Sequence, residues 1–263
     1  MNLHVWAMMA AALAPTPGPR PAQSELSELV AEVRSADYRG DRAALARLDG
    51  ALSDLAPSEY RSYWQGFARW RRALNGFNET PTPTDLVVDL ETAVARFRAS
   101  LERRPDWIEA KLALVGCWGN LIYLAGSDAE RRKAILAESG PTFQWVMANA
   151  GDNPRALWIR GGMEFGAPPP IGGDFAKAAA TLEHGVACAW REAPSGTARP
   201  AWEPAWGGPE NLMNLAYMYA HGPQPNRALA LAYASGALTA VPEWHYVRDI
   251  LLPQIEALPP AAK

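Results

Sequence analysis

The chain has few of the residues that crosslink proteins or bind metal ions. Its 263 residues include two cysteines, Cys117 and Cys188, and four histidines. Two cysteines cannot form a disulfide framework, and no Cys/His cluster has the spacing of a zinc site. Both cysteines fall in apolar, helix-like sequence, so we expect buried free thiols, although an exported chain could join them in one disulfide. The sequence indicates no metal site.

The sequence also lacks the short motifs of the common enzyme classes. It contains no HExxH, GxSxG, Walker A or dinucleotide-binding pattern. Glu183 and His184 adjoin on a predicted helix, but such a pair is more typical of a solvated helix face than of acid–base catalysis. We therefore predict no enzymatic activity, no catalytic residue and no cofactor.

Neither positive nor negative charge is concentrated in one stretch of the sequence. The formal net charge is −3, and the arginine runs, such as Arg131–Lys133, are interleaved with acidic residues. A protein that binds nucleic acid usually carries an uninterrupted basic stripe. We predict no nucleic-acid partner.

Long apolar runs are absent except near the N-terminus. Leu3–Ala14 is mostly apolar, too short to span a bilayer, and followed by the proline-rich stretch Pro15–Pro21. This pattern favours a signal peptide and linker over residues 1–23, even though no Lys or Arg precedes the run. We expect a periplasmic or secreted protein, not a transmembrane one, with a single helical domain over residues 24–263.

The rest of the chain is rich in residues that build packed helices. Apolar residues make up 49% of it, and it contains eleven tryptophans. Helical patterns separated by Pro and Gly breaks predict ten or eleven helices. The expected helical segments are Glu25–Asp37, Asp41–Leu55, Tyr60–Asn75, Asp85–Arg103, Pro105–Leu124, Asp128–Asn149 with a kink at Gly140-Pro141, Asn153–Phe165, a helix after Asp174, Glu210–His221, Asn226–Ala240 and a capping helix Glu243–Leu258.

One small–large–small pattern recurs in these segments. Side chains three and four residues apart share a helix face, so a small residue there lets a second helix approach closely. The matching triplets are Ala93, Phe97 and Ser100; Ala178, Leu182 and Gly185; and Ala228, Ala232 and Ser235. The segments before them carry Trp64, Phe67 and Ala68; Leu112, Val115 and Gly116; Trp158, Gly162 and Phe165; and Leu212, Leu215, Ala216 and Tyr219.

This recurrence beside Pro and Gly breaks resembles a divergent tetratricopeptide-repeat (TPR) protein of the exported bacterial kind, over roughly Tyr60–Pro242. The resemblance implies an all-α, right-handed superhelix of antiparallel helix pairs. Unit lengths are unequal, insertions are long and one predicted helix is off pattern, so another α–α superhelix is the alternative. Close packing at Gly116 and Gly162 is part of this expectation.

The resemblance also implies a non-catalytic role in protein–protein interaction or assembly in the cell envelope, with a protein or peptide in a concave groove. Arginine and amide groups would hold a carboxylate or peptide backbone, and methionine and tyrosine would form an apolar floor. The residues expected in the groove are Gln65, Arg69, Arg72, Cys117, Asn120, Met163, Met213 and Tyr217.

The alternative function is a small-molecule-binding protein or enzyme with a site near the Trp202–Trp206 loop. Exposed tryptophans in a loop can anchor a ligand. Trp202 and Trp206 could equally fill the space between the helices beneath them.

Overall fold

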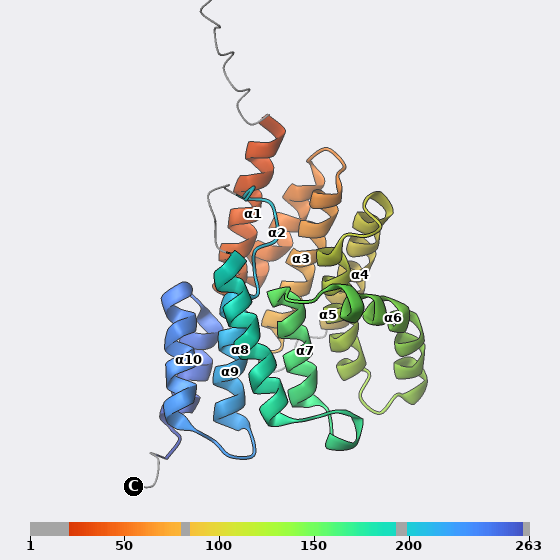
Figure 1. Ribbon diagram of the computed structural model, residues 1–263. Coiled ribbons are helices and arrows are strands. Elements are labelled where there is room, and N and C mark those ends of the chain that lie inside the picture. The colour runs from red at the N-terminus through yellow and green to blue at the C-terminus, as the bar shows by residue number, and fades with distance from the viewer. Residues whose placement is uncertain (1–20, 80–84, 193–198, 260–263) are drawn as a thin grey trace, which may run out of the picture.

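The computed structural model describes residues 21–79, 85–192 and 199–259, and these form eleven α-helices with no strand (Figure 1). The all-α prediction is therefore confirmed. The predicted signal peptide lies outside the described residues, apart from the final residues of its linker. The helices are α1 Pro21–Tyr38, α2 Arg42–Ser53, α3 Glu59–Gly76, α4 Leu86–Arg103, α5 Ile108–Leu124, α6 Ala129–Asn149, α7 Pro154–Gly166, α8 Phe175–Glu192, α9 Gly208–His221, α10 Arg227–Ala240 and α11 Leu252–Glu256.

Short polar residues and breakers set the helix boundaries. Ser58 caps α3, its hydroxyl accepting from the backbone N–H of Arg61 at 3.0 Å. Asn153 caps α7 directly before a proline at the first helical position. Pro105 separates α4 from α5, and Gly40 has a φ of +70° in the turn between α1 and α2. Successive helices consequently form antiparallel pairs.

Two of the three predicted triplets lie at helix contacts. Ala93, Phe97 and Ser100 on α4 are completely buried. On α8, Leu182 is fully buried, and a Cβ added at Gly185 would lie 2.5 Å from the side chain of Asn211. These helices therefore pack as closely as the small residues predicted.

The third triplet is wrong by two residues. Ala228, Ala232 and Ser235 are exposed. The fully buried residues of α10 are Ala230, Ala234 and Ala237, which have the same spacing. Because α10 has alanine or serine on several of its faces, the spacing of small residues alone fits two registers.

Of the two predictions of close packing at a glycine, the one for Gly116 is confirmed and the one for Gly162 is wrong. A Cβ at Gly116 would lie 2.5 Å from the indole of Trp70, so close packing there is confirmed. At Gly162 the nearest neighbour of a Cβ would be Asn214 at 3.6 Å, an ordinary contact. The close approach on α7 is made by Gly161, where a Cβ would lie 2.5 Å from Leu182.

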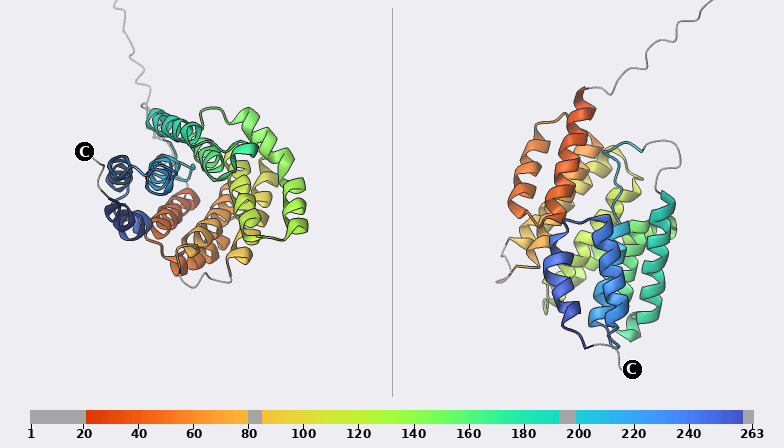
Figure 2. Two further views of the ribbon diagram at one scale, coloured as in Figure 1. Left: turned by 90° about the horizontal axis from the view of Figure 1, so that it is seen from below. Right: turned by 90° about the vertical axis from the view of Figure 1, so that its left-hand side faces the viewer.

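The helix array curls until its C-terminal part meets α1 (Figure 2). The rings of Tyr38, at the end of α1, and Trp244 pack edge to face with centroids 5.1 Å apart. Trp244 precedes a π-helical turn, Tyr246–Leu251, which leads into α11. The predicted capping segment thus exists as two short elements and covers one end of α1.

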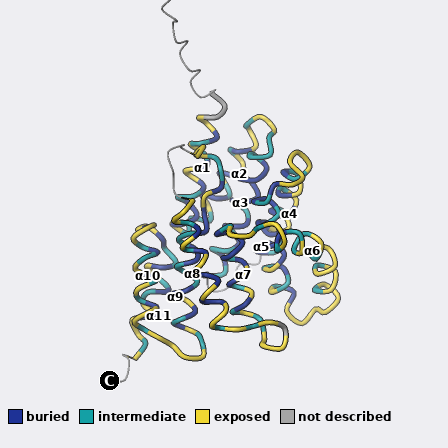
Figure 3. The backbone as a smooth tube through the Cα atoms, viewed as in Figure 1, coloured by how far each residue is buried: buried dark blue, intermediate teal, exposed yellow. Residues whose placement is uncertain are grey.

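Helix α6 is the least buried part of the array. It continues through Pro141 as one bent helix, so the proline bends it without dividing it (Figure 1). Its buried residues are Ser139 and Val146, and much of the helix is exposed (Figure 3). No helix in the described ranges is long and apolar enough to cross a membrane.

Candidate functional site

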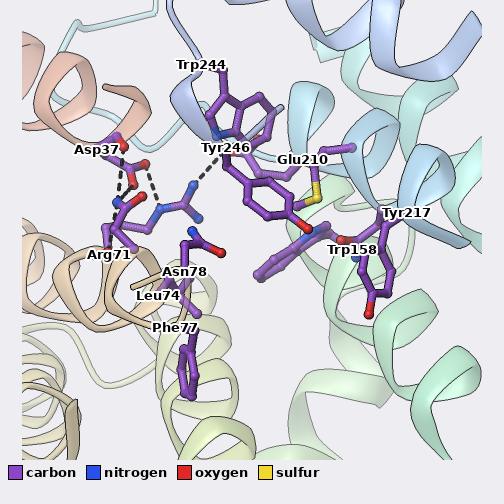
Figure 4. Close-up of a pocket in the computed structure, with 13 residues that line it drawn as sticks. Asp37, Arg71, Leu74, Phe77, Asn78, Trp158, Glu210, Tyr217, Trp244 and Tyr246 are labelled. Carbon is purple, nitrogen blue, oxygen red and sulfur yellow. Dashed lines mark hydrogen bonds and ion pairs between the residues drawn. The ribbon is translucent and has the colours of Figure 1, made fainter. Parts of the chain in front are cut away.

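A cavity of about 270 Å³ opens on the concave side of the array (Figure 4). The C-terminal ends of α1 and α3, the helices α7 and α9, and the segment before the π-helical turn enclose it. Aromatic rings and amides make up most of its lining. The lining residues are Asp37, Arg71, Leu74, Asn75, Phe77, Asn78, Trp158, Glu210, Met213, Asn214, Tyr217, Trp244 and Tyr246.

One side of this cavity is a buried network of charges. The guanidinium of Arg71 donates to Asp37 at 2.6 Å and to Glu210 at 3.3 Å. The hydroxyl of Tyr38 donates to the same carboxylate of Glu210 at 3.0 Å. Burial raises the pKa of Asp37 above its usual value, and the charge of Arg71 opposes that rise. One cation facing two carboxylates leaves this wall without spare positive charge.

Aromatic rings form much of the remaining lining. Trp244 and Tyr246 enter from the C-terminal segment, Phe77 from the end of α3, and Trp158 from α7 (Figure 4). Burial, with a smaller contribution from the nearby Tyr217, raises the pKa of Tyr246 to about 12, so its hydroxyl stays protonated at neutral pH. Aromatic rings provide apolar contact area for a largely apolar ligand.

Trp158 also has an unpartnered polar atom. Its indole Nε1 is buried and has no hydrogen-bond partner among the described residues. Buried N–H groups in folded proteins nearly always have an acceptor. A ligand with an acceptor atom at this point would satisfy the group.

A second cavity, of about 360 Å³, adjoins the first and shares Trp158 and Asn214 with it. Helices α3, α5 and α7 enclose it. Glycines keep it open, since a Cβ added at Gly119 or Gly166 would meet no atom within 4 Å. Together the cavities form one concave groove, with Trp158 where they meet.

Four of the predicted groove residues lie in this groove. Met213 and Tyr217 line the first cavity, and Asn120 and Met163 line the second. The side-chain oxygen of Asn120 accepts from the indole of Trp70 at 3.1 Å, so part of this amide holds the wall in place. These four residues come from α5, α7 and α9, three of the predicted first helices.

The α3 residues predicted for the groove lie elsewhere. Gln65 is buried and donates to Ser53 at 2.8 Å. Arg69 donates to Asp49 at 2.6 Å, and Arg72 donates to Asp85 at 2.5 Å. Arg69 pairs with the buried carboxylates of Asp49 and Asp89, which require a counterion, so these side chains hold α3 to the neighbouring helices.

Cys117 also lies outside the groove. Its side chain is completely buried in the main core, and burial raises the pKa of its thiol well above the usual value. Cys188 is buried on α8, and both thiols are free. The expectation of buried free thiols is confirmed, whereas the groove assignment of Cys117 is wrong.

The loop before α9 packs against the main core. Trp206 is 3% exposed and belongs to the main core, where its indole donates to the hydroxyl of Tyr63 at 3.0 Å. The carbonyl of Trp202 accepts from the indole of Trp64 at 2.8 Å. Of the two interpretations of this loop, the structure supports the one in which its tryptophans fill space between helices.

Several residues of the cavity were not predicted as site residues. On α3 the residues that line the cavities are Trp70, Arg71, Leu74 and Asn75, next to the predicted Arg69 and Arg72. Trp244 and Tyr246 were assigned only to a capping helix. A buried arginine needs acidic partners, and this requirement is the signal that could have indicated Arg71. Its partners Asp37 and Glu210 are too distant in sequence to be paired with it in advance.

Comparison with known proteins identifies a related fold. No family model and no curated protein matches the chain. Among solved structures, the HusA haemophore from Porphyromonas gingivalis is similar, with 17% sequence identity and a TM-score of 0.57, over 83% of this chain and 96% of that one. At this identity the likeness shows a shared all-helical fold alone. Membership of the TPR family stays a prediction.

Proposed function

We propose that the chain is a non-catalytic binding protein that holds a flat, largely apolar small molecule in the concave groove. The observation that carries the proposal is Trp158, a residue that lines both cavities and whose buried indole N–H has no partner among the described residues. Aromatic walls would cover the faces of the ligand, and the indole would donate to an acceptor atom on it. The likeness in fold to a haemophore supports a ligand of this general shape.

Haem itself fits this lining less well than an uncharged flat molecule. Met213 offers a thioether, but none of the described residues that line the cavities is a histidine. Haem carries two carboxylates, which need nearby cations. Arg71, the cation of the described lining, already faces Asp37 and Glu210. The groove therefore favours a neutral or cationic ligand over a dianionic one.

Porphyrins of different charge test this proposal. Protoporphyrin IX dimethyl ester has the flat shape without the charges, and protoporphyrin IX and haemin have both. Titration of the folded chain, followed through porphyrin absorption, should show the ester bound more tightly than either acid. Replacement of Trp158 by Phe should weaken ester binding by about 3- to 10-fold, as expected for loss of one hydrogen bond.

The matched control is Trp190→Phe, because Trp190 lies on α8 with 76% of its surface exposed. This variant should bind the ester like the wild type. Absence of ester binding, or equal binding by Trp158→Phe and the wild type, would contradict the proposal.

A second candidate is a protein or peptide partner in the same groove, in the role of an interaction or assembly module. Its support is the exposed apolar surface at the groove, where Met163 is 47% exposed and Tyr217 is 38% exposed. A peptide would cover both residues, so Met163→Asp should abolish capture of a partner from envelope extract. Ester binding without such capture favours the first candidate.

We further propose that the protein acts outside the cytoplasm, as the apolar N-terminal run favours. The mature protein from its native host should then lack the residues before about Gln23. Intact-mass measurement tests this, and a full-length chain in the cytosolic fraction would contradict it.

A further inference from the structure

Three potential metal ligands from two parts of the chain meet on the outer side of the array. Asp152 lies in the turn between α6 and α7, and His184 and Cys188 lie one helical turn apart on α8. The imidazole Nε2 of His184 is 2.7 Å from the carboxylate of Asp152 and 3.5 Å from the sulfur of Cys188. We propose that these residues form a zinc-binding site, separate from the concave groove and independent of the function proposed for it.

The donor set suits zinc. Imidazole nitrogen, thiolate sulfur and carboxylate oxygen are the three ligand types that Zn²⁺ binds in proteins. A His and a Cys four residues apart on a helix present their side chains on one face. Three protein ligands leave a fourth position for water, as in zinc sites that stay open to solvent.

The separation of His184 and Cys188 is that of a tetrahedral site. The 2.7 Å between His184 and Asp152 is shorter than the roughly 3.3 Å expected there, so the exposed carboxylate must shift when the ion binds. With zinc–nitrogen bonds of about 2.0–2.1 Å and zinc–sulfur bonds of about 2.3 Å, the nitrogen and sulfur lie roughly 3.5 Å apart. The observed separation in His184 and Cys188 is 3.5 Å. All three ligand atoms lie within 4.8 Å of one another, and the side chains of Asp152 and His184 are exposed enough to move.

Arg191 places a positive charge beside these potential ligands. Its guanidinium donates to the sulfur of Cys188 at 3.0 Å and lies 3.7 Å from a carboxylate oxygen of Asp152. When zinc binds, the thiol proton leaves to solvent, and the ion balances the thiolate and carboxylate charges. The side chain of Arg191 is 61% exposed, so it can turn into water.

Cobalt(II) tests the site, because a cobalt–thiolate bond gives a charge-transfer absorption in the near ultraviolet. Full-length protein should develop this absorption with one cobalt ion per chain and lose it when zinc is added. Cys188→Ala should abolish the absorption. The matched variant Cys117→Ala should keep it, because Cys117 is fully buried in the core. Absence of the absorption in the wild type, or its persistence in Cys188→Ala, overturns the proposal.

Two further measurements keep the test independent of the folding of any one variant. His184→Ala should weaken cobalt binding at least about tenfold, the smallest effect expected when even an outer partner of a metal site is lost. His221→Ala, at an exposed histidine on α9, should not weaken it. In the wild type, zinc should slow modification of Cys188 by a thiol reagent. An unchanged rate would overturn the proposal.

Discussion

The indole Nε1 of Trp206 donates a hydrogen bond to the hydroxyl of Tyr63 at 3.0 Å, although 143 residues separate them in sequence. Both side chains are almost completely buried. The contact joins the loop before α9 to the N-terminal part of α3. It explains why this loop belongs to the core.

Trp206→Ala should lower the free energy of unfolding by about 3–5 kcal/mol, because it removes a large buried ring. Trp206→Phe keeps much of the ring but leaves the hydroxyl of Tyr63 without this donor, so a loss of about 1–3 kcal/mol is expected. Urea denaturation measures both. Trp190→Phe, at an exposed site, is the control and should change stability by less than about 0.5 kcal/mol. Wild-type stability of Trp206→Ala would show that the loop does not pack as described.

Gly161 and Gly162 are neighbours on α7 that should respond differently to leucine. At Gly161 a larger side chain meets Leu182, so Gly161→Leu should cost about 1–3 kcal/mol or more. Gly162 borders the second cavity, so Gly162→Leu should leave thermal unfolding nearly unchanged. It should instead weaken binding of the porphyrin ester, because the added side chain enters the groove. The reverse order of stabilities would contradict the register of α7.

Arg72 should matter for stability and not for binding. Its side chain pairs with Asp89, which is 1% exposed and also contacts Arg69 and Arg42. Because these other partners remain, Arg72→Met should cost about 1–3 kcal/mol. The folded variant should bind the porphyrin ester like the wild type. A selective loss of binding would return Arg72 to the groove.

Glu192 should make the free energy of unfolding depend on pH in the acid range. Its partial burial would raise the pKa of its carboxyl, but hydrogen bonds and charge from Arg155 lower that pKa below the usual value for Glu. The unfolded chain then binds more protons at low pH, so this contribution is present at neutral pH and is lost as pH falls below about 4. Glu192→Gln should cost about 1 kcal/mol at pH 7 and less at pH 3. A constant difference in denaturation midpoint between the two pH values would contradict this.

Local signals in the sequence were sufficient for the helices. Caps such as Ser58 and breaks such as Pro105 act within one turn of the backbone, so the boundaries of most elements could be predicted closely. It was harder to predict which face of each helix is buried. On α10 the alanine pattern fits two registers, and on α3 three consecutive residues, Trp70, Arg71 and Arg72, point toward different neighbours.

The site depends on contacts that local patterns do not encode. Arg71 has its acidic partners on α1 and α9, and the Asp152 carboxylate approaches His184 only because α7 and α8 pack together. Neither grouping has a characteristic sequence spacing. Asn120, Met163, Met213 and Tyr217 do line the cavities, whereas Cys117, on the same helix as Asn120, faces the core.

The contact between Tyr38 and Trp244 joins the two ends of this array and should make its unfolding cooperative. Open helical repeats interact only with their neighbours, so their outer units can unravel separately. Here the C-terminal segment rests on α1, and Tyr38 is hydrogen-bonded to Glu210 on α9. Loosening either end breaks contacts at the other, so the described helices should melt together in a single transition instead of fraying stepwise.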